Sequence, residues 1–214
     1  MSRKIVNGTI FEVGTTYGSA ITISAATNAA QCVLTLSAAH GVTVGDVIEI
    51  VTSGWGALIG RAFRAVAVAT NDVTIAIDTS STASFPAGQG AGTARKVTAW
   101  AQIQQVNSPS VSGGEQNFGT GQYIDQSVGF EYPTNKSPIK VTFEVDDDQS
   151  LTYWTTLKAA QANLANYALR MTYPGSGGAV GTGIWTYSAA PALESNNVQK
   201  RTINVSLANV FTEY

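Results

Sequence analysis

The chain of 214 residues is long enough for one large domain or two small ones around a hydrophobic core. With 12% charged residues and a net charge of −2, it lacks the basic excess of dedicated nucleic-acid-binding proteins and has a surface that favours self-association. No apolar run approaches the roughly twenty residues of a membrane-spanning helix, and the start MSRKIVNGTIFEVG does not predict a secretory signal.

Most of the chain predicts β-strands. After a first strand within residues 1–16, runs in which apolar and polar side chains alternate occur at 32–36, 73–77, 139–145, 167–173 and 203–207. Such alternation, interrupted by Gly, Ser, Asn and Pro, is typical of antiparallel sheets. We therefore expect a mainly β protein built as an antiparallel sandwich or barrel. Cys32, the single cysteine, begins one of these runs, which predicts a buried and unreactive thiol.

Residues 19–96 differ from the rest of the chain because they contain several short strands. At their centre, HGVTVGDVIEI resembles the turn and following strand of small SH3-like or OB-like barrels. From residue 97 onwards the expected strands lengthen and a helix is predicted. We expect a discontinuous main domain, residues 1–18 and 97–214, with a small β domain inserted at 19–96.

The stretch FPAGQGAGTARKV, residues 85–97, is rich in glycine and ends in two basic residues, as phosphate-binding loops often do. Its spacing is G-x-G-x-G, however, and the following alternation predicts a strand at 97–106 rather than a helix. We interpret these glycines as a compliant link from the small domain into that strand. Arg95 and Lys96 are expected to be solvated at its exit.

Residues 107–126 have little periodicity and predict a long loop, and its aromatic Phe118 and Tyr123 suggest that it docks on another surface. Alternation then resumes at 127–132. It predicts that Val128, Phe130 and Tyr132 face the core, whereas Ser127, Gly129 and Glu131 face outward.

A single amphipathic helix is predicted at about 147–165. Its expected apolar face consists of Leu151, Trp154, Leu157 and Leu164. The aspartate triplet at 146–148 is expected to cap the helix and to complement its dipole, rather than to bind a metal. After the helix, the glycine-rich stretch at 174–183 predicts the tip of a long, flexible hairpin.

No arrangement of residues predicts catalysis. The single histidine, His40, precedes a glycine in a turn, and no serine nucleophile motif is found. Glu131 and Glu144 could form a carboxylate pair for glycoside hydrolysis, although a solvated sheet face explains them better.

Recognition of a carbohydrate or host surface is a second alternative, because tryptophans and tyrosines often form such sites. Trp55, Trp100 and Trp185 are the candidates, and burial in a core explains them at least as well.

The order of segments resembles the tail tube (major tail) proteins of long-tailed, lambda-type bacteriophages. The resemblance lies in HGVTVGDVIEIVTSGWGALIGRAFRAVAVATNDVTIAIDTS and FPAGQGAGTARKVTAWAQIQQV. The later order also matches: a loop, SVGFEY, KVTFEV, an amphipathic helix, a strand–hairpin–strand pair and a long terminal strand. The region 19–96 is larger than the minimal fold of that family requires.

The resemblance implies a non-enzymatic virion protein without a cofactor, assembled in the host cytoplasm. It also implies hexameric rings stacked into a hollow tube that conducts double-stranded DNA, with a tape-measure protein and tail terminator or baseplate proteins as partners. Two sets of residues follow from it as candidates: lumen-facing Ser127, Glu131, Lys140, Thr142 and Glu144, and ring-to-ring contacts at Arg3, Lys4, Phe118 and Tyr123. If the lumen set forms one face, its mild acidity would repel phosphates.

Overall fold

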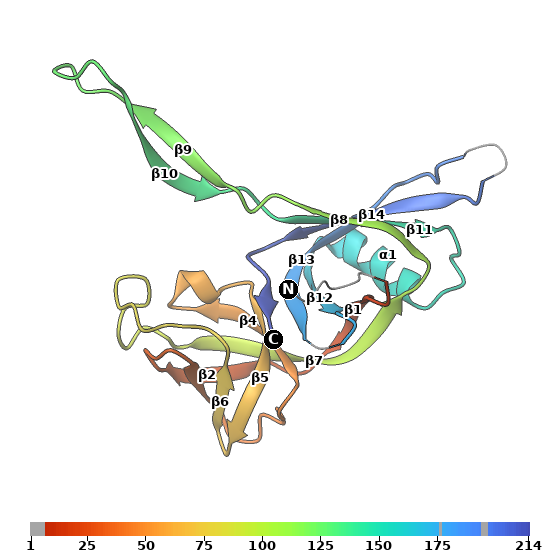
Figure 1. Cartoon of the computed structure of the whole chain (residues 1–214). Coiled ribbons are helices and arrows are strands. Elements are labelled where there is room, and N and C mark those ends of the chain that lie inside the picture. The colour runs from red at the N-terminus through yellow and green to blue at the C-terminus, as the bar shows by residue number, and fades with distance from the viewer. Residues whose placement is uncertain (1–6, 176, 194–196) are drawn as a thin grey trace.

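The computed structural model describes residues 7–175, 177–193 and 197–214. The chain is mainly β with one α-helix, which confirms the predicted fold class. Figure 1 shows a body with a long hairpin projecting from it. The elements are β1 (Ile10–Tyr17), β2 (Ile21–Ala26), β3 (Cys32–Leu36), β4 (Val47–Ser53), the 3-10 helix η1 (Gly56–Leu58), β5 (Ala62–Ala69), β6 (Asp72–Ile75), β7 (Gly92–Ile103), β8 (Val106–Ser112), β9 (Gln116–Gly121), β10 (Phe130–Lys136), β11 (Lys140–Asp146), α1 (Tyr153–Asn163), β12 (Asn166–Thr172), β13 (Gly178–Tyr187), β14 (Lys200–Leu207) and β15 (Thr212–Glu213).

Strands β2 to β6 and the first half of β7 form a closed antiparallel barrel, in the order β7-β2-β3-β6-β5-β4 and back to β7. Alternate side chains of these short strands point inward, because closure leaves the barrel interior as the place to bury them. The largest fully buried side chains of this interior are Trp55, which precedes η1, and Phe63 of β5, and Cys32 lies among them with no exposed surface. The burial predicted for this cysteine is therefore confirmed.

The second half of β7 continues into a second antiparallel sheet, in the order β7-β1-β12-β13-β14-β11-β8. This sheet curls around α1, which packs mainly against β13 (Figure 1). Trp154 and Leu157 of the helix share one core with Phe143, Trp185 and Val205 of the sheet. We call this unit the curled sheet.

Arg95 and Lys96 are not solvated as expected, because β7 already begins at Gly92 and both residues lie inside the strand. The Arg95 Nε donates a hydrogen bond to Glu49, at 2.8 Å, and its Nη2 donates to the Asn166 carbonyl on β12, at 3.1 Å. The guanidinium also lies 4.0 Å from the centre of the Tyr17 ring. Arg95 thus connects the barrel to two strands of the curled sheet.

Gly90 and Gly92 of the link serve close packing rather than compliance, whereas Gly88 has a left-handed φ of +75° and open space around it. A Cβ at Gly92 would lie 2.1 Å from the Thr52 carbonyl oxygen on β4. A Cβ at Gly90 would lie 2.6 Å from Ala26 and 3.2 Å from the Trp55 ring. Glycine is therefore required at both positions so that the chain can approach the barrel wall closely enough to close it.

The aspartates before α1 do not cap it. The helix begins only at Tyr153, and its N-terminus has no side-chain cap. Asp148 instead accepts hydrogen bonds from the backbone and the hydroxyl of Ser150, in the turn before the helix. Asp147 forms a buried ion pair with Arg201, at 2.7 Å. These aspartates therefore stabilise the turn before α1 and connect this turn to β14.

Two further expectations need correction. Leu164 is exposed rather than part of the apolar face of α1, because it ends the helix in a left-handed conformation with φ of 49°. The region 174–183 is not a long hairpin tip: β13 starts at Gly178, and its first half is buried. Small residues occur there because β13 is covered on both sides, as by Phe211 and Leu207 at Gly181.

We predict that Arg95→Met lowers the free energy of unfolding by about 3 kcal/mol, because Glu49 would stay buried without its cation. The neighbouring substitution Lys96→Met is the matched control. Its partner Asp46 is partly exposed and keeps two hydrogen bonds from Thr43, so we expect a loss of at most about 1 kcal/mol. Urea unfolding measures both; equal losses would contradict the importance of the Arg95 pair.

Candidate assembly surfaces

Residues 113–138 form an arm that leaves the body of the protein (Figure 1). It consists of β9 and β10, which make a separate two-stranded sheet, and of the connections around them. Every residue of β10 is exposed. The expected loop at 107–126 is therefore wrong: it contains β8, which pairs with β11 in the body, and β9, the first strand of the arm.

Three aromatic rings follow one another along one face of the arm, and we call them the aromatic ladder: Tyr123, Phe130 and Tyr132. The Tyr123 and Phe130 rings are stacked with 4.9 Å between their centres, and those of Phe130 and Tyr132 are 6.3 Å apart. The rings are 60%, 37% and 48% exposed, respectively. Aromatic surface of this kind usually marks a contact with another molecule.

Glycines on β9 make room for the ladder. Gly121 lies directly opposite Phe130, and Gly119 lies opposite Tyr132. A Cβ at Gly119 would be 2.7 Å from the Tyr132 ring, and a Cβ at Gly121 would be 2.8 Å from the Phe130 ring. The rings therefore cover these glycines and stabilise the hairpin, and the parts of the Phe130 and Tyr132 side chains that remain exposed are left for a partner.

The prediction that Val128, Phe130 and Tyr132 face the core is wrong. All three are exposed, and Val128 is 75% exposed. The alternation at 127–132 is followed by a strand only from Phe130 onwards, and the arm has no layer packed against it. A two-stranded hairpin in water is at best marginally stable. The apolar side chains of the arm are therefore open to solvent in the single chain.

The foot of the arm is rigid. Gly113 and Gly114 have φ values of +85° and +82°, and a Cβ at Gly113 would lie 2.0 Å from the Pro138 carbonyl oxygen. The amide of Gly114 donates to the Ser137 carbonyl, at 3.0 Å, and the amide of Ser137 donates to the Glu115 carbonyl, at 2.9 Å. This crossing fixes the direction in which the arm leaves the body.

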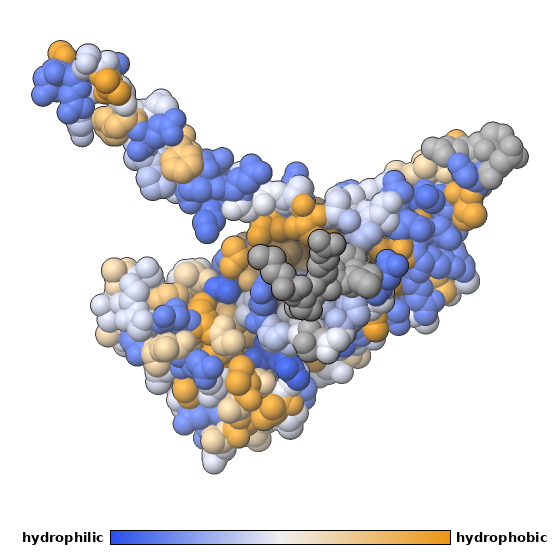
Figure 2. All heavy atoms as spheres, in the orientation of Figure 1, coloured by the Kyte–Doolittle hydropathy of each residue, from blue (hydrophilic) through white to orange (hydrophobic). Residues whose placement is uncertain are grey.

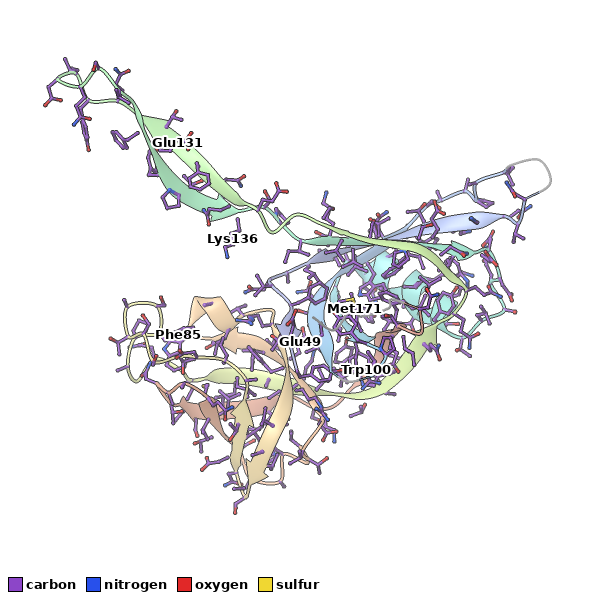
Figure 3. All side chains as sticks on the ribbon, viewed as in Figure 1. Glu49, Phe85, Trp100, Glu131, Lys136 and Met171 are labelled. Atoms are coloured by element: carbon purple, nitrogen blue, oxygen red, sulfur yellow. The ribbon has the colours of Figure 1, made fainter. Side chains whose placement is uncertain are left out.

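The five candidate lumen residues do not share one face. Lys140, Thr142 and Glu144 lie on the outward side of β11, whereas Ser127 and Glu131 lie on the arm, which forms a different sheet (Figure 3 labels Glu131). The sequence alternates identically in both segments, so periodicity alone could not separate them.

The outward side of β8, β11 and β14 is polar and electrically balanced. Thr142 donates a hydrogen bond to Asn204, at 2.9 Å, and the Lys200 amine lies 3.8 Å from the Glu144 carboxylate. Two cations and two carboxylates occur among its outward residues, so the mild acidity expected of it is not found. The face consists of Ser110, Ser112, Lys140, Thr142, Glu144, Asp146, Lys200, Thr202, Asn204 and Ser206.

The candidates for ring-to-ring contact have different outcomes. Phe118 lies opposite Pro133 on the arm and is 58% exposed, and Tyr123 belongs to the aromatic ladder. Arg3 and Lys4 lie outside the described residues. Sequence analysis missed Gly119 and Gly121. The glycines of GTG and the aromatic residues of FEY, which pair in the structure, are a hairpin pattern that could have been found in the sequence.

The residues considered for catalysis have structural roles. The Val42 amide donates to His40 Nδ1, at 3.0 Å, and His40 Nε2 lies 2.9 Å from the Thr70 carbonyl, which matches a histidine that holds a turn. Glu131 and Glu144 are on separate sheets. Within the described residues there is no cluster of three or more potential metal ligands.

The tryptophans considered for sugar binding belong to the cores. Trp55 and Trp185 are completely buried, and the Arg170 guanidinium covers Trp100 at 4.3 Å from the ring centre. The exposed aromatic residues of the described chain, Phe118, Tyr123, Phe130 and Tyr132, all lie on the arm. Figure 2 shows that hydrophobic and hydrophilic residues are mixed along this arm.

The mainly β body buries its large side chains, whereas the arm exposes aromatic ones. This combination is typical of a structural subunit of an assembly. The chain belongs to the phage tail tube protein family, whose family model matches residues 53–214. No curated protein matches the chain. In the parts of the chain that the structure describes, no helix is long and apolar enough to cross a membrane.

We predict that the triple substitution Tyr123→Ser, Phe130→Ser and Tyr132→Ser abolishes assembly while the melting temperature of the body changes little, because none of these rings contributes to a core. Val44→Ser with Val66→Ser is the control, since both valines are exposed on the barrel. Sedimentation velocity and thermal unfolding measure the two effects. Normal assembly of the triple variant would contradict a role for the arm.

Proposed function

We propose that six copies of this tail tube protein form a ring, and that rings stack into a hollow tube through which DNA leaves the capsid. The main support for this proposal is the structure of the arm. It exposes an aromatic ladder on a hairpin that has no core of its own, which is expected of a segment completed by neighbouring copies. Phe118 and Tyr123 then contact the next ring.

The lumen wall in this proposal is the polar face of β11 with its neighbours β8 and β14, which includes Lys140, Thr142 and Glu144. Attraction of DNA to a protein depends on cations that replace the counterions of the phosphates. Because Lys200 and Glu144 lie close together and the other charges of the face balance, the wall offers DNA few fixed cations. The hydroxyl and amide groups of this wall bind water, so DNA slides along the wall.

The same proposal covers partners and location. The subunit has a structural and not a catalytic role in the virion tail, and it assembles in the host cytoplasm. The tube encloses a tape-measure protein and ends on tail terminator or baseplate proteins. Cys32 is buried in the barrel, which suits assembly in a reducing compartment.

We also propose that the barrel is an inserted domain, 19–96, within a tube domain formed by 1–18 and 97–214. Two separate large cores support this division. The family match begins at residue 53, inside the barrel, so the barrel's later strands belong to the matched region. A smaller cluster that includes Val47, Val97 and Ala168 packs the two units together.

Electron microscopy of the purified protein tests the proposal. We expect rings with sixfold symmetry that stack into hollow tubes at high protein concentration. Class averages with a different symmetry would overturn the hexamer, and a persistent monomer at all concentrations would overturn the tube.

We predict that Glu144→Lys leaves tube assembly intact but slows DNA ejection several-fold, most strongly at low salt, because it adds cations to the lumen wall. Glu131→Lys is the matched control, since the same charge change then falls on the arm. Ejection from particles assembled with each variant is measured by dye uptake of the released DNA. Equal ejection rates at all salt concentrations would contradict the position of β11 in the lumen.

A further inference from the structure

A groove lies at the foot of the arm, where the arm joins the body. Its volume is about 350 Å³, and its lining includes Lys136, Pro138, Ile139, Leu207, Ala208 and Val210. All of these except Lys136 contribute apolar surface. We call it the foot groove, and its size is that of a site that accepts one or two side chains.

The walls of the foot groove are held in place from both units. The Leu207 amide donates to the Ile139 carbonyl, at 2.9 Å, which fixes the floor. Asn209 donates from its side chain to the carbonyls of Ala57 and Ile59, at 3.4 and 3.2 Å, and so ties the outer wall to the barrel. A groove that is already formed needs little rearrangement to accept a partner.

Charge distinguishes the two ends of the arm. Lys136, at the foot, has no ion-pair partner among the described residues, and Figure 3 shows it near the space between arm and barrel. Asp125, at the tip, likewise has none in the described chain. The tip therefore offers a carboxylate beside the Tyr123 ring, whereas the groove is mostly apolar with a cation at its edge.

The tip cannot reach the foot groove of its own chain. The six residues of β9 alone span roughly 20 Å, and the rigid crossing at Gly113 directs the arm away from the body (Figure 1). A second copy of the chain supplies a partner of complementary charge for each of these surfaces.

We propose that the arm tip of one copy, with Tyr123 and Asp125, docks in the foot groove of another copy, where Asp125 pairs with Lys136. This inference rests on the proposed function and names the receiving surface. Tip and groove are different surfaces of the same chain, so the contact is heterologous and can be repeated indefinitely. Each copy receives one arm and offers one, which links successive rings of the tube.

Cysteine crosslinking tests the contact, because the native Cys32 is buried and does not interfere. Ile124 at the tip is fully exposed, and Ala208 in the groove is also exposed, so both can be replaced without disturbing a core. The double variant Ile124→Cys with Ala208→Cys, assembled and mildly oxidised, is expected to give a ladder of covalent oligomers well beyond the dimer on non-reducing gels.

The control double variant Ile124→Cys with Lys158→Cys places the second thiol on the exposed side of α1, and we expect no ladder from it. Equal ladders from both variants would overturn the proposal. Tubes that form normally without crosslinking of the groove variant would overturn the foot groove as receptor while leaving the tube function intact. Failure of the native chain to form tubes would count against the proposed function itself.

A charge exchange gives an independent test. Lys136→Glu is expected to raise the protein concentration needed for assembly about tenfold, and adding Asp125→Lys is expected to restore it. Lys158→Glu, with the same change in charge, should have no effect. Lack of restoration by the second substitution would overturn the pairing of Asp125 with Lys136.

Discussion

The first half of β7 closes the barrel and its second half pairs with β1 in the curled sheet, so one continuous strand belongs to two cores. Arg95 lies where the two meet, bound to Glu49 of the barrel and to the Asn166 carbonyl of the sheet. Burial raises the pKa of Glu49, and the hydrogen bond from Arg95 opposes that rise. Glu49 and Arg95 both belong to the barrel, so the contacts across to the sheet are the Arg95–Asn166 hydrogen bond and the packing of Val47 and Val97 against Ala168. These contacts, together with the continuous strand β7, join the two units into one body.

The body determines where the arm lies. The paired strands β8 and β11 lead into the arm, and the glycine crossing at its foot fixes its direction. The body encloses its largest side chains in two cores, while the arm exposes its aromatic ladder. Under the proposed function, neighbouring copies in the tail tube cover the arm that the single chain leaves exposed. The balanced polar face of β11 is compatible with the same proposal, since a conduit for DNA must not bind it.

Much of the fold could be predicted because alternating apolar and polar side chains indicate a strand with one buried face. Residues 32–36 and 139–145 alternate, and both are strands with one face in a core. The same pattern at 127–132 led to a wrong prediction of core residues, since alternation does not reveal whether a second layer packs against a strand. A strand rather than a helix follows the glycines at 85–97, as predicted, but the role of Gly90 and Gly92 depends on Thr52 and Trp55, which are distant in sequence. Likewise, Arg95 and Glu49 are 46 residues apart, so nothing local could reveal their pairing.

Hydrogen exchange of the arm amides, compared between the free subunit and assembled tubes, tests most directly whether neighbouring copies complete the arm. Amides in β9 and β10 are expected to exchange rapidly in the free subunit, because a solvated two-stranded hairpin opens easily. In tubes they are expected to be strongly protected, while amides in the barrel remain protected in both states. Arm amides that exchange equally fast in tubes and in the free subunit would contradict the assembly role of the arm.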